Sequence, residues 1–269
     1  MQRFSIFTWF GYQLHFEQSL ELIRNAGFTN VMLWWGETDG EPSLFHQAEL
    51  AAQKGAPAEN AHLPFDGCNT LWLPGEEGEH YTSSILHALE DCARVDIPVL
   101  VVHLSHTAHP PPPSDIGISR LHRAAEAAAK HGTVLALENL RTPLHLHTAM
   151  EALRGAEVGF CYDSGHHQCW CPKEPLTDTY GHRLTALHLH DNKGEHDEHL
   201  LPFDGAIDWA ALARSLTKTP YSGPIGLEVQ AYHGYETHMS AEAFLDAAFT
   251  AAKRIGDMIT NSPHLHNVF

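Results

Sequence analysis

The chain has 269 residues, of which 43% are hydrophobic and 9% aromatic, a composition that excludes disordered and fibrous proteins. Its 33 acidic residues outnumber 16 lysines and arginines, and the formal net charge of −17 argues against nucleic-acid and anionic-membrane partners. The apolar run near the N-terminus is too short for a signal peptide, and no apolar segment of about 18 residues follows, so we expect a cytoplasmic protein. The five cysteines are an odd number and widely spread, which favours reduced thiols.

Eight short apolar runs alternate with amphipathic segments along the whole chain. Each run is six to eight residues long, and proline occurs in them only near an end, as expected for buried strands. The predicted strands are Ser5–Phe10, Asn30–Trp35, Asn60–Phe65, Val99–Leu104, Val134–Leu140, Val158–Asp163, Leu184–Asp191 and Pro224–Val229.

The segments between these strands carry helix signals. Phe16, Leu20 and Ile23 have helical spacing in a stretch that ends at Gly27. An alanine-rich helix is expected over 118–129, beginning near Ser114 and stopping at Gly132. Ser240 is a suitable N-cap for the last helix.

Strands that alternate with helices predict a parallel sheet, and eight such pairs match a single (β/α)8 TIM barrel. An open doubly wound sheet would need a glycine-rich phosphate loop after the first strand, and TWFGYQ does not provide one. The chain shows no internal linker and no repeat at the period of solenoid proteins. We therefore expect one domain over residues 1–269.

Four strands of this predicted barrel end on a polar residue. They are Glu138, Asp163, His188 and Glu228, from the fifth to the eighth strand. Two positions before each stands a small residue on the same face of the strand, namely Ala136, Cys161, Ala186 and Gly226. The residues between are large and would face the helices, so all four polar side chains are expected to point into one cavity at the carboxyl end of the barrel.

Three carboxylates in one partly dry cavity repel one another unless a cation is present. Three oxygen ligands and one imidazole suit a divalent metal ion, and Mn²⁺, Mg²⁺, Co²⁺ and Zn²⁺ all remain candidates. The alternative is a hydrogen-bonded polar plug without metal.

Other histidines and acids lie near the same predicted edge. His62 and His103 lie at the third and fourth strand ends and are expected to line the cavity. His166 could hold a substrate hydroxyl or a second metal. Asp197 and His199 could be further metal ligands, or could brace the long loop after the seventh strand.

An ordered set of motifs resembles the xylose-isomerase-like TIM-barrel superfamily, whose members include sugar phosphate isomerases/epimerases and endonuclease IV. The motifs are HLPF (62–65), LEN (137–139), DSGH (163–166), HLHDNKGEHDEH (188–199), G-x-IDW (205–209) and GLEV (226–229). The resemblance implies that Glu138 and Glu228 act as the acid/base pair through a metal-stabilised enediolate. It implies a metal-dependent isomerase or epimerase of a sugar, polyol or related hydroxy-carbonyl compound.

The resemblance also suggests substrate contacts and rival activities. Lys193 stands near the place of an arginine that holds substrate in the epimerases, and Trp9 and Trp35 are expected to stack on the sugar. Trp34 and Trp35 cannot both face inward. The family also contains inosose dehydratases, so a dehydratase (lyase) that uses the same site is the alternative activity. An endonuclease IV-like zinc phosphodiesterase is a second, less favoured alternative. Phe65 stands where that nuclease has a histidine ligand, which argues against DNA. A sugar-binding module is the non-enzymatic rival, and homo-oligomerisation stays open.

Overall fold

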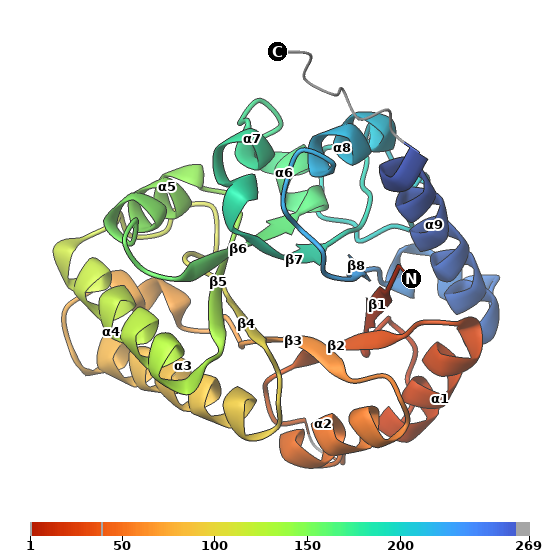
Figure 1. Cartoon of the computed structure of the whole chain (residues 1–269), viewed down its shortest axis with the longest axis horizontal. Coiled ribbons are helices and arrows are strands. Elements are labelled where there is room, and N and C mark those ends of the chain that lie inside the picture. Colours follow the sequence, from red (N-terminus) through yellow and green to blue (C-terminus); the bar gives the residue numbers. More distant parts are fainter. Residues whose placement is uncertain (1, 39, 262–269) are drawn as a thin grey trace.

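The computed structural model describes residues 2–38 and 40–261, which contain an eight-stranded parallel sheet (Figure 1). The strands are β1 (Phe4–Phe7), β2 (Asn30–Trp34), β3 (Ala58–His62), β4 (Val99–Val102), β5 (Val134–Glu138), β6 (Val158–Asp163), β7 (Leu184–His188) and β8 (Ile225–Leu227). Each pairs with its sequence neighbour, and β1 also pairs with β8. A parallel bridge between Leu189 and Leu227 joins β7 to β8, with the Leu189 N–H donating to the Gly226 carbonyl at 2.9 Å. The prediction of a (β/α)8 barrel is confirmed.

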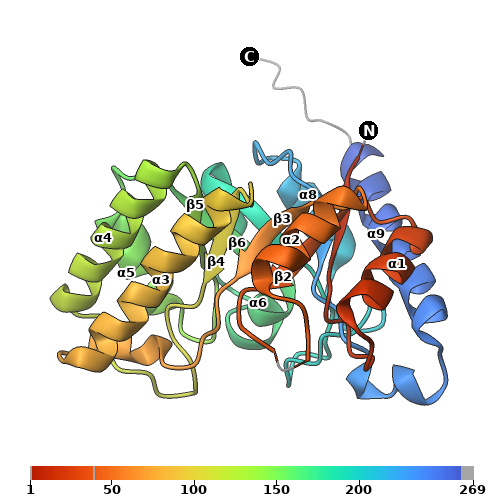
Figure 2. The ribbon, with the colours of Figure 1, turned by 90° about the horizontal axis from the view of Figure 1, so that it is seen from below.

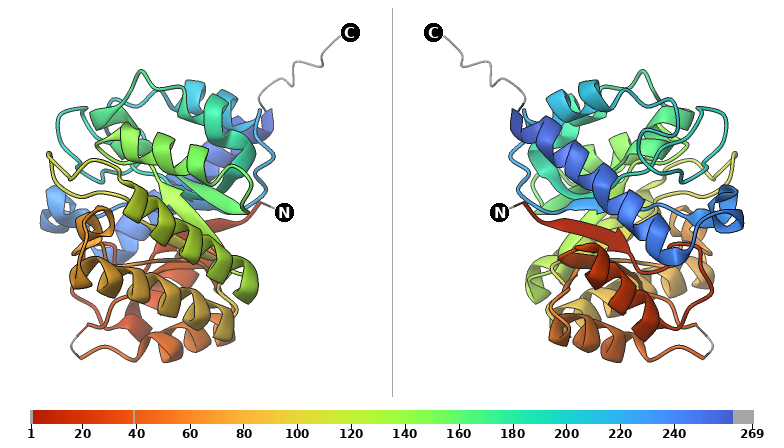
Figure 3. Two further views of the ribbon diagram at one scale, coloured as in Figure 1. Left: turned by 90° about the vertical axis from the view of Figure 1, so that its left-hand side faces the viewer. Right: turned by 90° about the vertical axis from the view of Figure 1, so that its right-hand side faces the viewer.

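Helices pack around the outside of the strands (Figures 2 and 3). In the described part of the chain they are α1 (Phe16–Ala26), α2 (Leu44–Gln53), α3 (Glu76–Arg94), α4 (Asp115–His131), α5 (Pro143–Ala152), α6 (Ser164–Trp170), α7 (Leu176–Tyr180), α8 (Trp209–Leu216) and α9 (Ala241–Asn261). Four short 3₁₀ helices lie in the connections, at Cys68–Trp72, Gly181–Arg183, Ala231–His233 and Tyr235–Thr237.

The helix ends follow the signals in the sequence. α1 ends at Gly27, whose φ of 110° requires the left-handed conformation that glycine adopts without strain. The Ser114 hydroxyl accepts a hydrogen bond from the Gly117 N–H at the start of α4, and the Ser240 hydroxyl does the same for Ala243 in α9. Gly132 terminates α4 with a φ of 75°.

The barrel has a small inner core and a large outer one. The inner core contains Val99, Val101, Ala136, Cys161 and Ala186. The large partners of these small residues, Leu137, Tyr162, Leu187 and Leu227, pack in the outer core beneath the helices. The predicted alternation is therefore confirmed, with the small residues inside the barrel and their large partners outside it.

β3 differs from its predicted position. It covers Ala58–His62 rather than 60–65, and its pairing with β2 skips Glu59, since Val31 pairs with Ala58 and Met32 with Asn60. Such a bulge turns consecutive side chains toward the same face of the sheet. The chain therefore reaches the carboxyl edge of the barrel at His62.

Two expectations from composition can be compared with the structure. All five cysteines are free, and four of them are buried. Across the described residues, no helix combines the length and apolar character needed to cross a membrane.

Candidate active site

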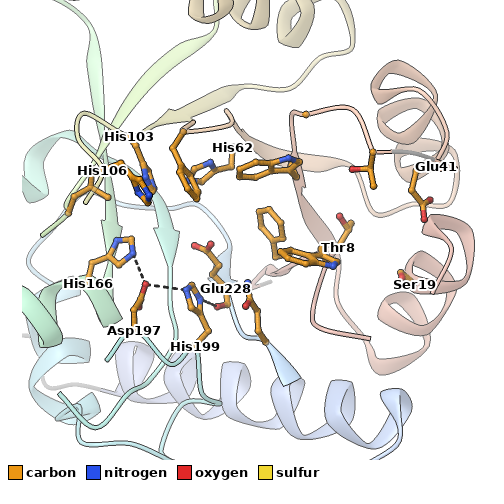
Figure 4. A pocket seen from close by; sticks show the side chains of 18 of the residues that line it. Thr8, Ser19, Glu41, His62, His103, His106, His166, Asp197, His199 and Glu228 are labelled. Atoms are coloured by element: carbon orange, nitrogen blue, oxygen red, sulfur yellow. Dashed lines mark hydrogen bonds and ion pairs between the residues drawn. The ribbon is translucent and has the colours of Figure 1, made fainter. Parts of the chain in front are cut away.

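A cavity of about 700 Å³ opens at the carboxyl ends of the strands. Figure 4 shows histidines and acids along its inner wall, with Asp197 between His166 and His199. Residues from the ends of β1 and β2 and from the loops after them complete the opposite wall, where the aromatic side chains of Trp9 and Trp34 take part. Phe65, from the loop after β3, stacks on His103 beside the histidines. One wall of the cavity is therefore polar and titratable, and much of the other is apolar.

The four predicted strand-end residues come together beneath this cavity, where Glu228 lines it and the other three are buried behind its wall. Glu138, Asp163 and His188 are the last residues of β5, β6 and β7, and Glu228 directly follows β8. Asp163 and His188 are register partners, so neighbouring strands place them side by side. One candidate ligand atom from each of the four residues lies within 4.8 Å of the others.

Several buried atoms of this cluster have no hydrogen-bond partner among the described residues. They are both ring nitrogens of His188, Oε1 of Glu138 and Oε2 of Glu228. The His188 Nδ1 lies 2.9 Å from the Glu228 carboxylate, but outside hydrogen-bonding geometry. Buried polar atoms left without partners are costly, and a divalent cation would satisfy the two carboxylate oxygens and one ring nitrogen of His188 at once. The three carboxylates and one imidazole therefore fit the ion that they were expected to hold.

The charges of the cluster depend on one another. Burial alone would raise the pKa of Glu138, but His103, His166 and His188 hold it well below its ordinary value. Burial also opposes ionisation of Glu228, yet His188 and His199 lower its pKa to about 2. Burial would lower the pKa of His188, and Cys161 and Glu228 instead raise it well above its ordinary value. Both glutamates are thus ionised at neutral pH, and a proton on His188 occupies the place that a cation would take.

A second group of histidines surrounds Asp197. His166 donates Nδ1–H to the Asn139 carbonyl at 3.0 Å, and His199 donates Nδ1–H to the Glu228 carbonyl at 2.7 Å. Both rings therefore turn Nε2 to the same oxygen of Asp197, at 3.2 and 3.4 Å. Histidines that bind metals are commonly held in this way, by a carbonyl on the other ring nitrogen.

A third group lies on the other side of Glu138. The Nε2 atoms of His62 and His103 lie 3.2 and 3.0 Å from its Oε2 atom. His62 donates Nδ1–H to the Leu63 carbonyl at 2.9 Å, so its Nε2 is also left to face the carboxylate. Burial lowers the pKa of His103, against the opposing effect of Glu138. Glu138 is thus enclosed by imidazoles and has a side chain only 1% exposed.

Two residues that the sequence analysis did not single out position this site. Asn139 donates Nδ2–H to the Asp163 carbonyl and accepts from the Asp163 N–H, both at 2.8 Å, which ties β5 to β6 at the site. Asp191 accepts hydrogen bonds from the Phe203 and Ile207 amides and from the Trp209 indole, the last at 2.7 Å. It anchors the loop that carries Asp197 and His199. The HLHDN motif (188–192), which contains Asp191, was the sequence signal that could have identified this residue.

Not every expected substrate contact lies in the cavity. His62, His103, His166 and Trp9 line it, whereas Trp35 is 6% exposed and packs against Phe45 in the core. Trp34 lines the cavity in its place, because alternation along β2 turns Trp34 inward.

Lys193 also differs from expectation. Its side chain is 71% exposed, its amine lies 3.6 Å from Glu198, and it does not line the cavity. The loop after β7 turns outward at this point, so the amine extends into solvent. Arg141 and Trp170, which the sequence analysis did not select, do line the cavity.

Comparison with known proteins agrees with this architecture. The family model described as "Xylose isomerase-like TIM barrel" matches residues 20–252. The uncharacterized protein y4fM of Sinorhizobium fredii is 25% identical over an alignment 289 positions long, which covers 91% of this chain and 89% of the relative. D-psicose 3-epimerase of Clostridium cellulolyticum H10, crystallised with D-tagatose, has a TM-score of 0.77 at 13% identity over 96% of this chain and 99% of its own. IolI, crystallised with a bound zinc atom, has a TM-score of 0.72 at 18% identity, over 98% of this chain and 100% of its own. The chain belongs to the xylose isomerase-like TIM barrel family.

Proposed function

We propose that the protein is a divalent-metal-dependent isomerase or epimerase of a sugar, polyol or related hydroxy-carbonyl compound. The observation that carries this proposal is the cluster of Glu138, Asp163, His188 and Glu228 at the base of the cavity. Two of its members are ionised glutamates, which are suitable bases for removing a proton next to a carbonyl. The structural likeness to a sugar 3-epimerase supports the substrate class, and the zinc atom in IolI supports the cofactor.

The four ligands would hold one ion of Mn²⁺, Mg²⁺, Co²⁺ or Zn²⁺. When bound, such an ion would polarise the substrate carbonyl and acidify the neighbouring C–H bond. The two carboxylates would stay ionised beside it, since both have a pKa below the ordinary range even without the ion.

Glu228 is the better placed of the two glutamates to meet the substrate first. Its side chain is 16% exposed and lines the cavity, whereas Glu138 lies beneath the imidazoles of His62 and His103. We assign proton removal to Glu228 and proton return to Glu138, which the protonated His166 ring, 3.3 Å away and with a pKa well above its ordinary value, can resupply with a proton. Return to the opposite face of the same carbon gives an epimer. Return to the adjacent carbon gives an isomer.

The remaining wall would orient the sugar and exclude water. Trp9 and Trp34 offer flat apolar surfaces for the C–H face of a sugar ring or chain. His103 and His166 would bind hydroxyl groups from the opposite side.

The test is deuterium incorporation in D₂O, followed by NMR, with Mn²⁺-loaded protein and a panel of ketoses, aldoses, inososes and their phosphates. Exchange next to a carbonyl is expected, and Glu228→Gln and Glu138→Gln should each abolish it while leaving the thermal transition in place. Glu195→Gln, an exposed site in the loop after β7, is the matched control and should exchange normally. Exchange at the normal rate in either site variant would remove that glutamate from the proposed role.

A dehydratase is the alternative on the same site. If the carbanion formed by Glu228 expels a β-hydroxyl instead of regaining a proton, the product loses water. The same NMR experiment distinguishes this outcome by the appearance of a dehydrated product.

A second candidate function follows from the two additional histidine groups. His62 and His103 with Glu138, and His190 and His199 with Asp197, could each hold a further ion. Three ions per chain would favour an endonuclease IV-like phosphodiesterase. The net charge of −17 opposes DNA binding. Mass spectrometry of the metal content and an assay with abasic-site DNA distinguish the two candidate functions. One ion per chain and no cleavage supports the isomerase or epimerase, whereas three ions and cleavage support the phosphodiesterase.

A further inference from the structure

Arg141 is the one lysine or arginine among the described residues that line the cavity. It lies in the loop after β5, three residues beyond Glu138, and its side chain is exposed. Three carboxylates, those of Glu41, Asp197 and Glu228, line the same cavity. Among the residues that the structure describes, Arg141 is therefore the only permanent positive charge that the cavity wall presents to a ligand.

Stacking holds the guanidinium of Arg141 in place. Its central carbon lies 4.5 Å from the ring centroid of Trp170, at the end of α6. Trp170 in turn stacks on His166, with centroids 4.6 Å apart and ring planes 19° apart. Arg141, Trp170 and His166 thus form one continuous stack that leads from the cavity mouth to the metal-binding cluster. The N–H donors of the guanidinium have no hydrogen-bond partner among the described residues, so they stay free to bind a ligand.

No carboxylate in the described structure neutralises Arg141. It has no ion pair or hydrogen bond there, in contrast to Arg120, which donates to four carbonyls and to Glu79. The carboxylates of the cavity already have their own partners. Glu41 accepts from the Phe16 amide, Asp197 is flanked by His166 and His199, and Glu228 lies beside His188.

We propose that Arg141 binds an anionic group of the substrate, a carboxylate or a phosphate, at the end of the molecule remote from the carbon that exchanges its proton. Planar guanidinium groups bind both anions through paired hydrogen bonds. The substrate would then be a sugar acid or a sugar phosphate rather than a neutral sugar. This inference rests on the proposed function for its chemistry, but its binding step can be measured without turnover.

The binding test uses three unreactive probes of matching carbon chain, namely sorbitol, gluconate and sorbitol 6-phosphate. Calorimetry on the Mn²⁺-loaded protein should show at least one anion binding about 10- to 100-fold tighter than sorbitol, the range for a charge-assisted hydrogen-bonded pair. Whichever anion is preferred identifies carboxylate or phosphate as the natural group. In Arg141→Met, which keeps a long side chain over Trp170, the preference should fall to near one while sorbitol binding is unchanged.

Two further variants complete the design. Arg141→Lys should retain part of the preference, because the charge remains and the paired geometry is lost. Arg214→Met removes an exposed arginine on α8 that does not line the cavity, and it should bind all three probes normally. Equal binding of sorbitol and both anions to the wild type would overturn the proposal, as would an anion preference that survives in Arg141→Met. These results do not depend on deuterium exchange, so the failure of the proposed chemistry and the failure of this inference are distinguishable.

Discussion

Glu59 allows a quantitative test of how the barrel interior treats a charge. It is the residue that the β2–β3 register skips, it is 7% exposed, and its Oε1 has no hydrogen-bond partner among the described residues. A Cβ atom at Gly226 would lie 3.0 Å from this oxygen, so the glycine leaves room for the carboxyl. Burial raises the pKa of Glu59 to about 7, against smaller opposing effects of Ser5 and His188.

The sign of the effect follows from where the proton is held. Between pH 4.5 and about 7 the native state keeps a proton on Glu59 that the unfolded chain has lost, so the free energy of unfolding falls as pH rises. A shift from 4.5 to about 7 corresponds to about 3 kcal/mol. Glutamine in this place has no proton to lose and the same shape as the neutral acid. Glu59→Gln should therefore gain about 2–3 kcal/mol over the wild type between pH 5 and pH 8, because part of the full change falls below pH 5.

The measurement is urea unfolding of both proteins at half-unit intervals from pH 5 to pH 8.5. Other titrating groups are common to the two proteins, so they cancel in the difference. Glu21→Gln, an exposed position on α1, is the control and should follow the wild type at every pH. A difference between Glu59→Gln and wild type that stays constant with pH would refute the reasoning, because it would show that Glu59 is charged in the native state.

Three other changes test the surroundings of the site. A Cβ at Gly165 would overlap the ring of His190, which lies 3.1 Å from the proposed ligand Asp163. Gly165→Ala should therefore weaken Mn²⁺ binding about 10-fold or more, as measured by calorimetry. Gly155→Ala is the control and should bind Mn²⁺ normally, because the space around Gly155 is open. Arg120→Ala leaves buried carbonyl groups without hydrogen-bond donors, so it should lower the free energy of urea unfolding by about 3–5 kcal/mol. A decrease of under about 1 kcal/mol would show that Arg120 does not stabilise these carbonyls. Because Cys161 and Glu228 raise the pKa of His188, its proton competes with the metal, and Mn²⁺ should bind more tightly at pH 8 than at pH 6. Equal affinity at the two pH values would mean that His188 is already neutral.

Much of the barrel was predictable because strand and helix periods are local properties of the sequence. The small residues at Ala136, Cys161 and Ala186 predicted an inward face, and the structure places them in the inner core. β3 was predicted too late along the chain. The apolar residues of LPF (63–65) favoured a strand there, although Pro64 has no N–H to donate to a neighbouring strand. The strand itself contains the polar pair Glu59 and Asn60, which an apolar pattern does not identify.

The loop contributions could not be read in the same way. Arg141 and Trp170 come from different βα connections, and only the folded chain brings the guanidinium over the indole. Trp34 and Trp35 differ by one position in a strand, so the choice between cavity and core depended on where inward alternation begins in β2. The outward turn of Lys193 depends on the loop after β7. Neither composition nor spacing specifies such a loop path.

The alternation of acids and imidazoles explains how one barrel end holds so many buried titratable groups. Each carboxylate of the site faces histidines: Asp163 lies 3.1 Å from His190, and Glu228 lies 2.9 Å from His188. Without a metal, protons on His188 and His199 balance the acids, because the pKa of His188 is raised well above its ordinary value and that of His199 to about 9. A divalent cation would balance the same acids and release protons from the rings. Under the proposed function, protonated imidazoles and a metal ion would thus be alternative counterions in one site, which would give the histidines a role in both states and account for their density at this end of the barrel.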